Sequence, residues 1–262
     1  MGRGLLEKTC VINKKILNSW YDSVTLPVAP MCNMMCNFCM RDADCICNGN
    51  DPSCLSRTMT PRQAVNHALS EVRKNSRARV IKITGPGEPL YNEQTFETLR
   101  RLNNEMPEFI FIINTNGLLL KEKIEELKEL NVGMINVSVN AASIETAARL
   151  YSRIVVDGIN CRNLYEMSEE ILNLQYEGIK ECIAQGIRVG INTLYLRRIN
   201  EDDIKEIALK YKRLGVKSMS LISKFQNNRL GCIDGMDFSL MENLRYSISK
   251  IMDDVEIKSF GT

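Results

Sequence analysis

Six short apolar runs alternate along the chain with segments of helical periodicity. The runs are rich in β-branched and aliphatic residues, which is typical of strands buried on both faces of a parallel sheet. They read "SVTLPVAP", "ARVIKITGPG", "FIFIINTNG", "MINVSVNA", "IRVGINTLYL" and "VKSMSLIS", and they begin at residues 23, 78, 109, 134, 187 and 216. Six β–α units in succession predict an α/β fold with a parallel sheet and helices outside it.

The helical segments carry start signals. Ahead of the first helix, Thr60 is a candidate N-cap, Pro61 suits the first helical position and Gln63 completes a capping box. Further helices are predicted from "NEQTFETLRRLNNEM", "KEKIEELKEL", "YEMSEEILNLQYEGIKECIAQG" and "EDDIKEIALKYKRLG", and a closing helix from near Ser239. Because no Pro/Gly-rich linker interrupts the alternation, we expect one domain over 1–262. Its core would span about 23–224, with a short N-terminal extension and a C-terminal helix.

Composition narrows the class of protein. The 262 residues are 44% hydrophobic and 25% charged, as in ordinary globular proteins, and the net charge of +2 gives no electrostatic case for nucleic acid. The start, "MGRGLLEKTC", lacks a signal-peptide apolar stretch, and runs such as "FIFII" are far shorter than the roughly 20 residues of a membrane span. We therefore expect a cytoplasmic protein without a membrane partner. Its clustered thiols are then expected to be metal ligands or catalytic groups rather than disulfides.

Polar residues gather where the predicted strands end. Active sites of such sheets lie at the carboxyl ends of the strands, and buried polar groups need partners there. The residues are Gly85, Gly87 and Glu88 after the second strand, Asn114, Thr115, Asn116 and Gly117 after the third, Ser138 and Asn140 in the fourth, and Asn192 and Thr193 in the fifth. Their convergence predicts a functional site at this edge.

The first strand ends in a loop with three cysteines spaced C-x3-C-x2-C. Cys32, Cys36 and Cys39 can bind three irons of a [4Fe–4S] cluster and leave the fourth iron open. Zinc is the competing interpretation. It would need a fourth ligand, for which the same loop offers Cys45, Cys47 and Cys54.

Two motifs resemble those of the radical S-adenosylmethionine (SAM) superfamily. "CNMMCNFC" is similar to its cysteine signature, including the aromatic Phe38 before the third cysteine, and "TGPGEP" is similar to its glycine-rich, acidic methionine-binding motif. The resemblance implies a partial (β/α)6 barrel of TIM type, in agreement with the six runs. It also implies a [4Fe–4S] cluster, SAM as cofactor, and flavodoxin or ferredoxin as electron donor.

A longer set of segments resembles the nitrogenase cofactor maturase family, NifB. They include "VAPMCNMMCNFCMRDADC", "ITGPGEPLYNEQTFETL", "INVSVNAASIETAARLYSRI" and "NLQYEGIKECIAQGIRVGIN". The chain departs from that pattern upstream of the cysteine loop, where Cys10 stands without a His. It also offers Ile112 and Ile113 where a cysteine is expected, and it lacks the C-terminal C-x2-C segment. The resemblance implies a NifB-like enzyme without several of the ligands for substrate clusters.

The resemblance also implies roles for residues. Cys32, Cys36 and Cys39 would ligate the cluster, Gly85 and Gly87 would let the backbone approach the methionine amine, and Glu88 would support that loop or the amine. Candidates for the carboxylate and ribose contacts are Thr115, Asn116, Ser138, Asn140 and Asn192, and candidates for the adenine wall are Leu196 and Leu221. The residue that receives the radical is not indicated.

The remaining thiols fall into two groups. Cys45, Cys47 and Cys54 are candidate ligands of a second iron–sulfur cluster, with Cys10, or they are spare thiols on a loop. Cys161, Cys182 and Cys232 are expected to be structural. Three functions stay open on sequence grounds: a NifB-like enzyme of iron–sulfur cofactor biosynthesis, a radical enzyme that modifies a peptide or small molecule, and a non-catalytic iron–sulfur scaffold. An iron–sulfur donor or acceptor protein is a candidate partner.

Overall fold

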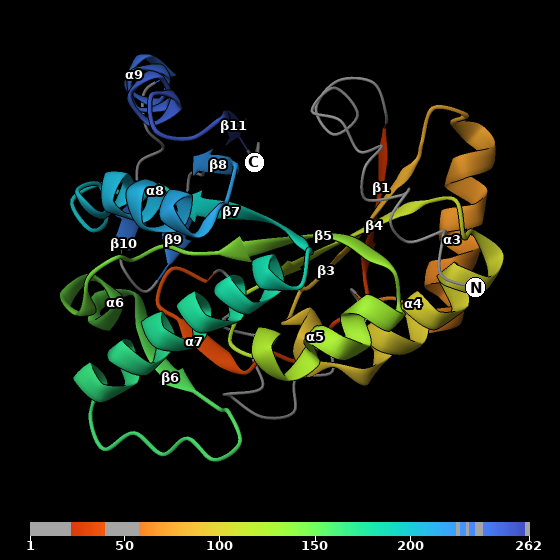
Figure 1. Cartoon of the computed structure of the whole chain (residues 1–262), viewed down its shortest axis with the longest axis horizontal. Coiled ribbons are helices and arrows are strands. Elements are labelled where there is room, and N and C mark those ends of the chain that lie inside the picture. The colour runs from red at the N-terminus through yellow and green to blue at the C-terminus, as the bar shows by residue number, and fades with distance from the viewer. Residues whose placement is uncertain (1–21, 40–57, 224–225, 229–230, 234–237, 260–262) are drawn as a thin grey trace.

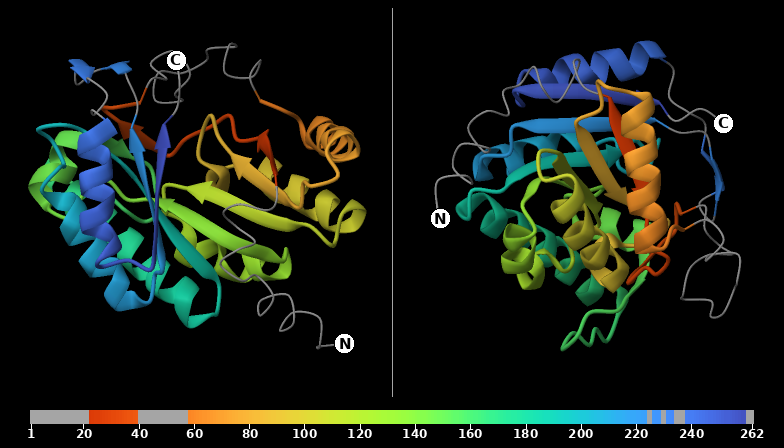
Figure 2. Two further views of the ribbon diagram at one scale, coloured as in Figure 1. Left: turned by 90° about the horizontal axis from the view of Figure 1, so that it is seen from above. Right: turned by 90° about the vertical axis from the view of Figure 1, so that its right-hand side faces the viewer.

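The computed structural model describes residues 22–39, 58–223, 226–228, 231–233 and 238–259. Its centre is a seven-stranded parallel sheet in the order β1-β3-β4-β5-β7-β8-β11. These strands are β1 Ser23–Pro27, β3 Val80–Thr84, β4 Ile110–Thr115, β5 Val132–Ser138, β7 Arg188–Leu194, β8 Ser218–Ser223 and β11 Asp254–Ser259. The sheet curls into a half-barrel with the helices on its outer face (Figures 1 and 2).

Six helices of the described segments follow the strands as the sequence predicts, and the structure adds α6. They are α3 Pro61–Lys74, α4 Glu93–Glu105, α5 Leu120–Glu129, α6 Ile144–Leu150, α7 Leu164–Ala184, α8 Asp203–Leu214 and α9 Phe238–Ser249, with a 3₁₀ turn, η3, at Pro89–Tyr91. At the start of α3, the Gln63 amide donates to Thr60 Oγ1 over 3.3 Å and the Thr60 amide donates to Gln63 Oε1 over 2.9 Å. The predicted capping box is confirmed. No helix in these segments is long and apolar enough to cross a membrane.

All six predicted strands are present, and the structure adds a seventh. Strand β11 follows the closing helix and pairs in parallel with β8. Its residues Val255 to Lys258 alternate between apolar and charged side chains, which is the pattern of a strand with one face against the core. Two short pairs complete the fold: β2 Met34–Cys36 with β6 Tyr151–Ile154, and β9 Gln226–Asn228 with β10 Gly231–Ile233, both antiparallel.

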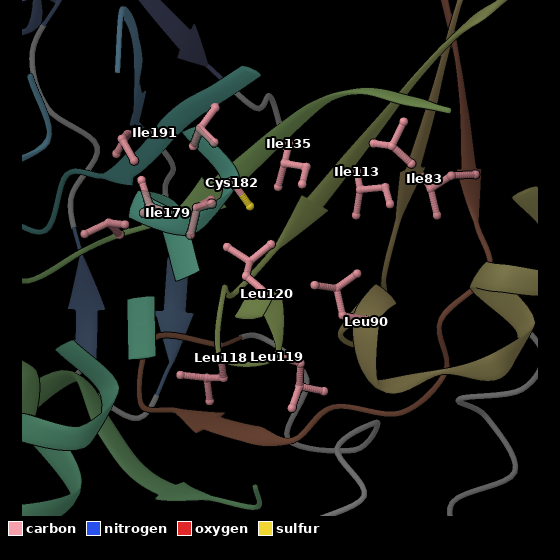
Figure 3. Close-up of a cluster of buried hydrophobic side chains, with 14 of the residues drawn as sticks. Ile83, Leu90, Ile113, Leu118, Leu119, Leu120, Ile135, Ile179, Cys182 and Ile191 are labelled. Atoms are coloured by element: carbon pink, nitrogen blue, oxygen red, sulfur yellow. The ribbon is translucent and has the colours of Figure 1, made fainter. Parts of the chain in front are cut away.

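One apolar layer lies between the sheet and the helices. Ile83, Ile113, Ile135 and Ile191 each come from a different strand and are at most 1% exposed. Figure 3 shows this layer together with Cys182 of α7, which is fully buried. Burial raises the pKa of its thiol to about 12, so it stays protonated at neutral pH. The structural role predicted for Cys182 is confirmed.

Helix α7 reaches the ends of β4 and β5 through a close contact at Gly178. A Cβ atom at Gly178 would lie 2.7 Å from Leu120 Cβ and 3.5 Å from the carbonyl oxygen of Gly117. One turn earlier, Gln175 Nε2 donates to the carbonyl oxygens of Asn116 (2.7 Å) and Ser138 (3.0 Å). The helix therefore holds the turn after β4 in place.

We predict that Gly178→Ala destabilises the protein by about 1–3 kcal/mol, because the new methyl group overpacks the contact with Leu120. In an open helix the same substitution would stabilise by roughly 0.5–1 kcal/mol. Asn173→Ala is the matched control, since Asn173 is exposed on the same helix and its replacement should be neutral or slightly stabilising. Urea unfolding measures both variants. A gain in stability for Gly178→Ala would contradict the packing argument.

Candidate functional site

The cysteine loop is braced by the β6 region on one side. Cys36 lies in β2, which pairs with β6, and Cys32, Cys36 and Cys39 are all half-buried and outside disulfides. The amide of Asn37 donates to the carbonyl of Leu150 over 2.8 Å, and Asn37 Nδ2 donates to the carbonyl of Arg149 over 2.9 Å. These bonds hold the loop from a segment more than 100 residues away.

The loop after β3 braces the cysteine loop on its other side. The Glu88 amide donates to the Met31 carbonyl over 2.7 Å, and Asn92 Nδ2 donates to the same oxygen over 2.8 Å. Asn92 Oδ1 accepts from the Met31 amide over 3.1 Å. Both polar groups of the residue before Cys32 are therefore satisfied by the Gly85–Asn92 segment. Asn92, which is 1% exposed, was not identified from the sequence.

Close backbone packing explains the two glycines of this segment. A Cβ atom at Gly87 would lie 1.9 Å from the Met31 carbonyl oxygen, and one at Gly85 would lie 2.5 Å from the carbonyl oxygen of Gly87. Neither contact is sterically possible for a larger residue. Gly87 is thus required for the approach of the cysteine loop; its expected approach to the methionine amine stays a prediction.

The carboxylate of Glu88 ties the second strand end to the third. Its Oε1 accepts from the Thr115 hydroxyl over 2.5 Å and from the Leu90 amide over 3.0 Å, and its Oε2 accepts from the Asn116 amide over 2.6 Å. Glu88 is only 3% exposed. Hydrogen bonds to a buried carboxylate are among the stronger ones in proteins. Of the two predicted roles of Glu88, support of the loop is the one these bonds describe.

Asn116 extends this network to the cysteine loop. Its Nδ2 donates to Asn33 Oδ1 over 2.8 Å, while its Oδ1 accepts from the Leu118 amide over 3.0 Å. Asn33, between Cys32 and Met34, is 1% exposed, and its Nδ2 has no partner in the described part of the chain. The sequence signal for Asn33 was its position inside the cysteine motif.

Near the ends of β5 and β7, some polar side chains already make hydrogen bonds within the protein and others do not. Asn140 Oδ1 accepts from the Leu194 amide over 2.8 Å, and its Nδ2 lies 3.4 Å from the Tyr151 hydroxyl. The Ser138 and Asn192 side chains, which are neighbours in register, make no hydrogen bond with the other described residues. Ser138 and Asn192 are therefore better placed than Asn140 to bond a ligand.

The two expected adenine contacts lie in the apolar core. Leu196 is 1% exposed and Leu221 is fully buried. On β8, Leu221 alternates with the half-buried Ser220 and Ile222, so it points to the helix-covered face of the sheet. The structure does not bring Leu221 to the concave face with the other candidates, and the adenine wall stays a prediction.

The three thiols have the chemistry of cluster ligands. Phe38 packs edge-on against Tyr151, with 6.0 Å between ring centroids, and so fixes the chain just before Cys39. Within the described ranges, no three His, Cys, Asp or Glu side chains converge on one point as the ligands of a single metal ion would. In a [4Fe–4S] cluster each thiolate binds a different iron, and the donor set fits that group.

The other cysteines, apart from Cys182 in the core, either lie outside the described residues or line a pocket. Cys45, Cys47, Cys54 and Cys10 lie outside the described residues, as does the side chain of Cys232. Cys161 is half-buried and lines a pocket of about 320 Å³ with Arg153, Arg162 and Met167. Burial raises the pKa of the Cys161 thiol, and the nearby Glu170 and Glu166 raise it further. It is not a ligand of the described cysteine loop.

Comparison with known proteins identifies the family. The sequence profile described as "Radical SAM superfamily" matches residues 26–210. The FeMo cofactor biosynthesis protein NifB of Methanocaldococcus infernus is 34% identical over 208 residues, which are 79% of this chain and 68% of that relative. The chain is a radical SAM protein of the NifB family. Membership implies an enzyme with a [4Fe–4S] cluster and SAM as cofactors.

Further NifB relatives support the family, and two solved structures support the fold. The NifB proteins of Chlorobaculum tepidum and Klebsiella pneumoniae are each 30% identical over 77% and 81% of this chain, which spans 47% and 45% of their length. The chain thus covers about half of these two relatives. Streptococcus suis SuiB bound to S-adenosylmethionine superposes with a TM-score of 0.65 at 15% identity, covering 93% of this chain and 51% of SuiB. A Sphaerobacter thermophilus radical SAM methyltransferase gives 0.65 at 16% identity, with 91% and 66% covered. These two likenesses confirm the partial barrel.

We predict that Gly87→Ala lowers the iron content of the reconstituted protein, because a methyl group would push the Met31 backbone and the cysteine loop away. Gly158→Ala is the control. Gly158 has no atom within 4 Å of an added Cβ, so the substitution meets only the backbone strain of a positive φ of 76°, about 1–2 kcal/mol. Iron and acid-labile sulfide per chain report the result. Equal iron content in the two variants would contradict this role of Gly87.

We predict that Glu88→Gln destabilises the protein by about 2 kcal/mol, since an amide replaces a buried charged acceptor of three hydrogen bonds. Glu93→Gln is the matched control. Glu93 is exposed and pairs with Arg100 over 2.9 Å, so its loss should change the free energy of unfolding by less than about 0.5 kcal/mol. Guanidinium unfolding compares the two variants, and similar values for both would refute the network's importance.

Proposed function

We propose that the protein cleaves SAM reductively and acts in the biosynthesis of an iron–sulfur cofactor of nitrogenase type. The observation that supports this most directly is the pair of braces on the loop of Cys32, Cys36 and Cys39, in a chain of the NifB family. The proposed electron donor is a flavodoxin or a ferredoxin. An iron–sulfur donor or acceptor protein is a further proposed partner.

The residues of the loop would hold the cluster, with one thiolate from each of Cys32, Cys36 and Cys39. When bound, a [4Fe–4S] cluster supplies the electron that breaks the S–C5′ bond of SAM, giving methionine and a 5′-deoxyadenosyl radical that takes a hydrogen atom from the substrate. The protein's contribution is orientation. The rigid bonds of Met31 to the loop after β3 set the position of the first thiolate relative to the strand ends.

The strand ends would bind SAM with groups that the fold leaves available. Ser138 and Asn192 are adjacent in register, and their side chains make no hydrogen bond with the other described residues. Thr115 is engaged twice, as donor to Glu88 and as acceptor from the Gly117 amide over 3.0 Å. We therefore assign direct contacts with SAM to Ser138 and Asn192, and a supporting position to Thr115.

The substrate half of the site differs from the pattern expected of the family. Ile112 and Ile113 stand before the "TNG" turn and are 3% and 0% exposed, so β4 offers no thiol there. Cys45, Cys47 and Cys54 are the proposed ligands of a second cluster. A second cluster would raise the iron content from about four to about eight per chain.

We predict that Cys36→Ala abolishes formation of 5′-deoxyadenosine, because the cluster loses one of its three ligands. The wild-type protein, reconstituted without oxygen with iron and sulfide, should bind at least about four irons and form 5′-deoxyadenosine from SAM under dithionite. Cys161→Ala is the control, since Cys161 lies outside the cysteine loop and should keep both properties. Iron analysis and chromatography of the nucleoside products measure the outcome.

The outcomes separate a SAM-cleaving enzyme from an iron–sulfur scaffold and from a zinc protein. Wild-type protein with an intact cluster and no 5′-deoxyadenosine would support an iron–sulfur scaffold and contradict the enzyme. Stoichiometric zinc without iron would contradict both the enzyme and the iron–sulfur scaffold. A Cys47→Ala variant that loses about half of its iron and still cleaves SAM would support a separate second cluster.

A further inference from the structure

The concave face of the sheet carries many polar side chains among apolar ones, whereas apolar layers fill a closed barrel. Along each strand, side chains alternate between the helix-covered face and the concave face. From β3 to β11 the half-buried polar residues at concave positions include Lys82, Asn114, Asn136, Ser138, Asn192, Ser218, Ser220, Glu256 and Lys258, and they share the face with Ile110, Ile112, Met134, Leu194 and Ile222. Such a row of partly desolvated polar groups is expected where a polar ligand binds.

The middle of this face is formed around Gly190 of β7. A Cβ atom there would lie 2.7 Å from Asn136 Oδ1, 2.8 Å from Met134 Cε and 2.9 Å from Ser218 Oγ, so the glycine lets these three side chains approach the strand. Asn136 Nδ2 donates to Asn114 Oδ1 over 3.0 Å. Hydrogen-bonding groups of β4, β5 and β8 thus converge on one spot.

One edge of the face carries a small charged cluster. Lys258 Nζ lies 2.5 Å from Glu256 Oε1 and donates to Ser220 Oγ over 2.9 Å, while the Ser220 hydroxyl lies 3.0 Å from the same carboxylate oxygen. Glu256 and Lys258 therefore form an ion pair with each other, and neither forms a hydrogen bond or ion pair with Lys82.

Lys82 faces this cluster from the other edge. Strands β3 and β11 stand second and seventh in the sheet, and in a flat sheet they would be about 24 Å apart. The curl of the sheet brings the two edges toward each other (Figure 2), and the charges of Lys258 and Glu256 therefore act on Lys82. The Lys82 amine makes no hydrogen bond or ion pair with the described residues. Burial lowers its pKa, the charge of Lys258 lowers it further, and Glu256 partly offsets both.

We infer that the concave face binds an anionic group of the substrate, with Lys82 as its counter-ion and the Asn114–Asn136 pair as hydrogen-bond partners. Lys82, Arg188 and Lys258 against Asp254 and Glu256 leave this face with one excess positive charge, and the half-buried amine of Lys82 has lost water without gaining a partner among the described residues. A bound anion would give the Lys82 amine a charged hydrogen-bond partner in place of the water that it lost on burial. The term substrate rests on the proposed function; the anion site itself does not.

The test uses inorganic phosphate as probe on the cluster-reconstituted protein, at constant ionic strength set with chloride. Bound phosphate should raise the thermal midpoint with increasing concentration. Lys82→Met should weaken phosphate binding at least tenfold, and Lys82→Arg should largely restore it. Lys217→Met, at an exposed lysine, is the matched control and should respond as the wild type does.

A second readout separates a binding role from a structural one. Without phosphate, Lys82→Met should raise the thermal midpoint, because a partly desolvated and unpaired charge is removed. A lowered midpoint together with unchanged phosphate affinity would show a structural lysine and overturn the inference. Equal loss of affinity for SAM and phosphate in Lys82→Met would assign the amine to the carboxylate of SAM and would also overturn the inference.

Formation of 5′-deoxyadenosine by the wild type tests the proposed function independently. Phosphate binding through Lys82 without SAM cleavage would therefore support the anion site and contradict the proposed function.

Discussion

The position of the Met31 backbone is the constraint on which the rest of the site depends. Its amide and carbonyl bond Asn92 and Glu88, and only Gly87 lets the two loops approach each other this closely. The cysteine loop begins one residue later. A cluster held there is positioned by backbone hydrogen bonds, which are less adjustable than contacts between flexible side chains. The exposed side chain of Met31, at 37%, contributes little to this arrangement.

The buried carboxylate of Glu88 passes that constraint on to the next strand. Its three hydrogen bonds reach η3, Thr115 and Asn116, and Asn116 returns to the cysteine loop through Asn33. The circuit is closed by residues about 30 to 80 positions apart in sequence. A closed network of this kind is rigid when every group is satisfied. Within the described residues, Asn33 Nδ2 is the buried polar atom of this network that has no hydrogen-bond partner.

The local sequence pattern was sufficient to predict most of the helices and strands, but it did not show which distant segments pair with one another. The six strands and the Thr60 capping box follow from apolar periodicity and from residues three positions apart, which the sequence displays directly. The β2–β6 pair is different, since its strands have three and four residues and acquire their stability from a partner over 100 residues away. Strand β11 had a readable alternation of apolar and charged residues, hidden only by its place after the closing helix.

The same distinction applies to the site. The spacing of Cys32, Cys36 and Cys39 identifies a ligand set because the three residues are neighbours in the chain. Asn92 and Gln175 were missed because a buried amide side chain gains its meaning from the carbonyl it bonds, and those carbonyls belong to Met31, Asn116 and Ser138.

Which face a strand residue occupies is the further piece of information that only the curled sheet provides. Leu221 and Lys82 illustrate this point, because the sequence shows both within strands and does not show which face is concave. Once the order β3 to β11 is known, Lys82 and Lys258 share that face and Leu221 does not. The braced cysteine loop follows the family pattern, while the concave face combines an apolar Ile112 with a neighbouring Lys82 in register. The braces of the cysteine loop and the charged residues at the edges of the concave face thus lie on different elements of the fold, so a substitution in one group need not disturb the other.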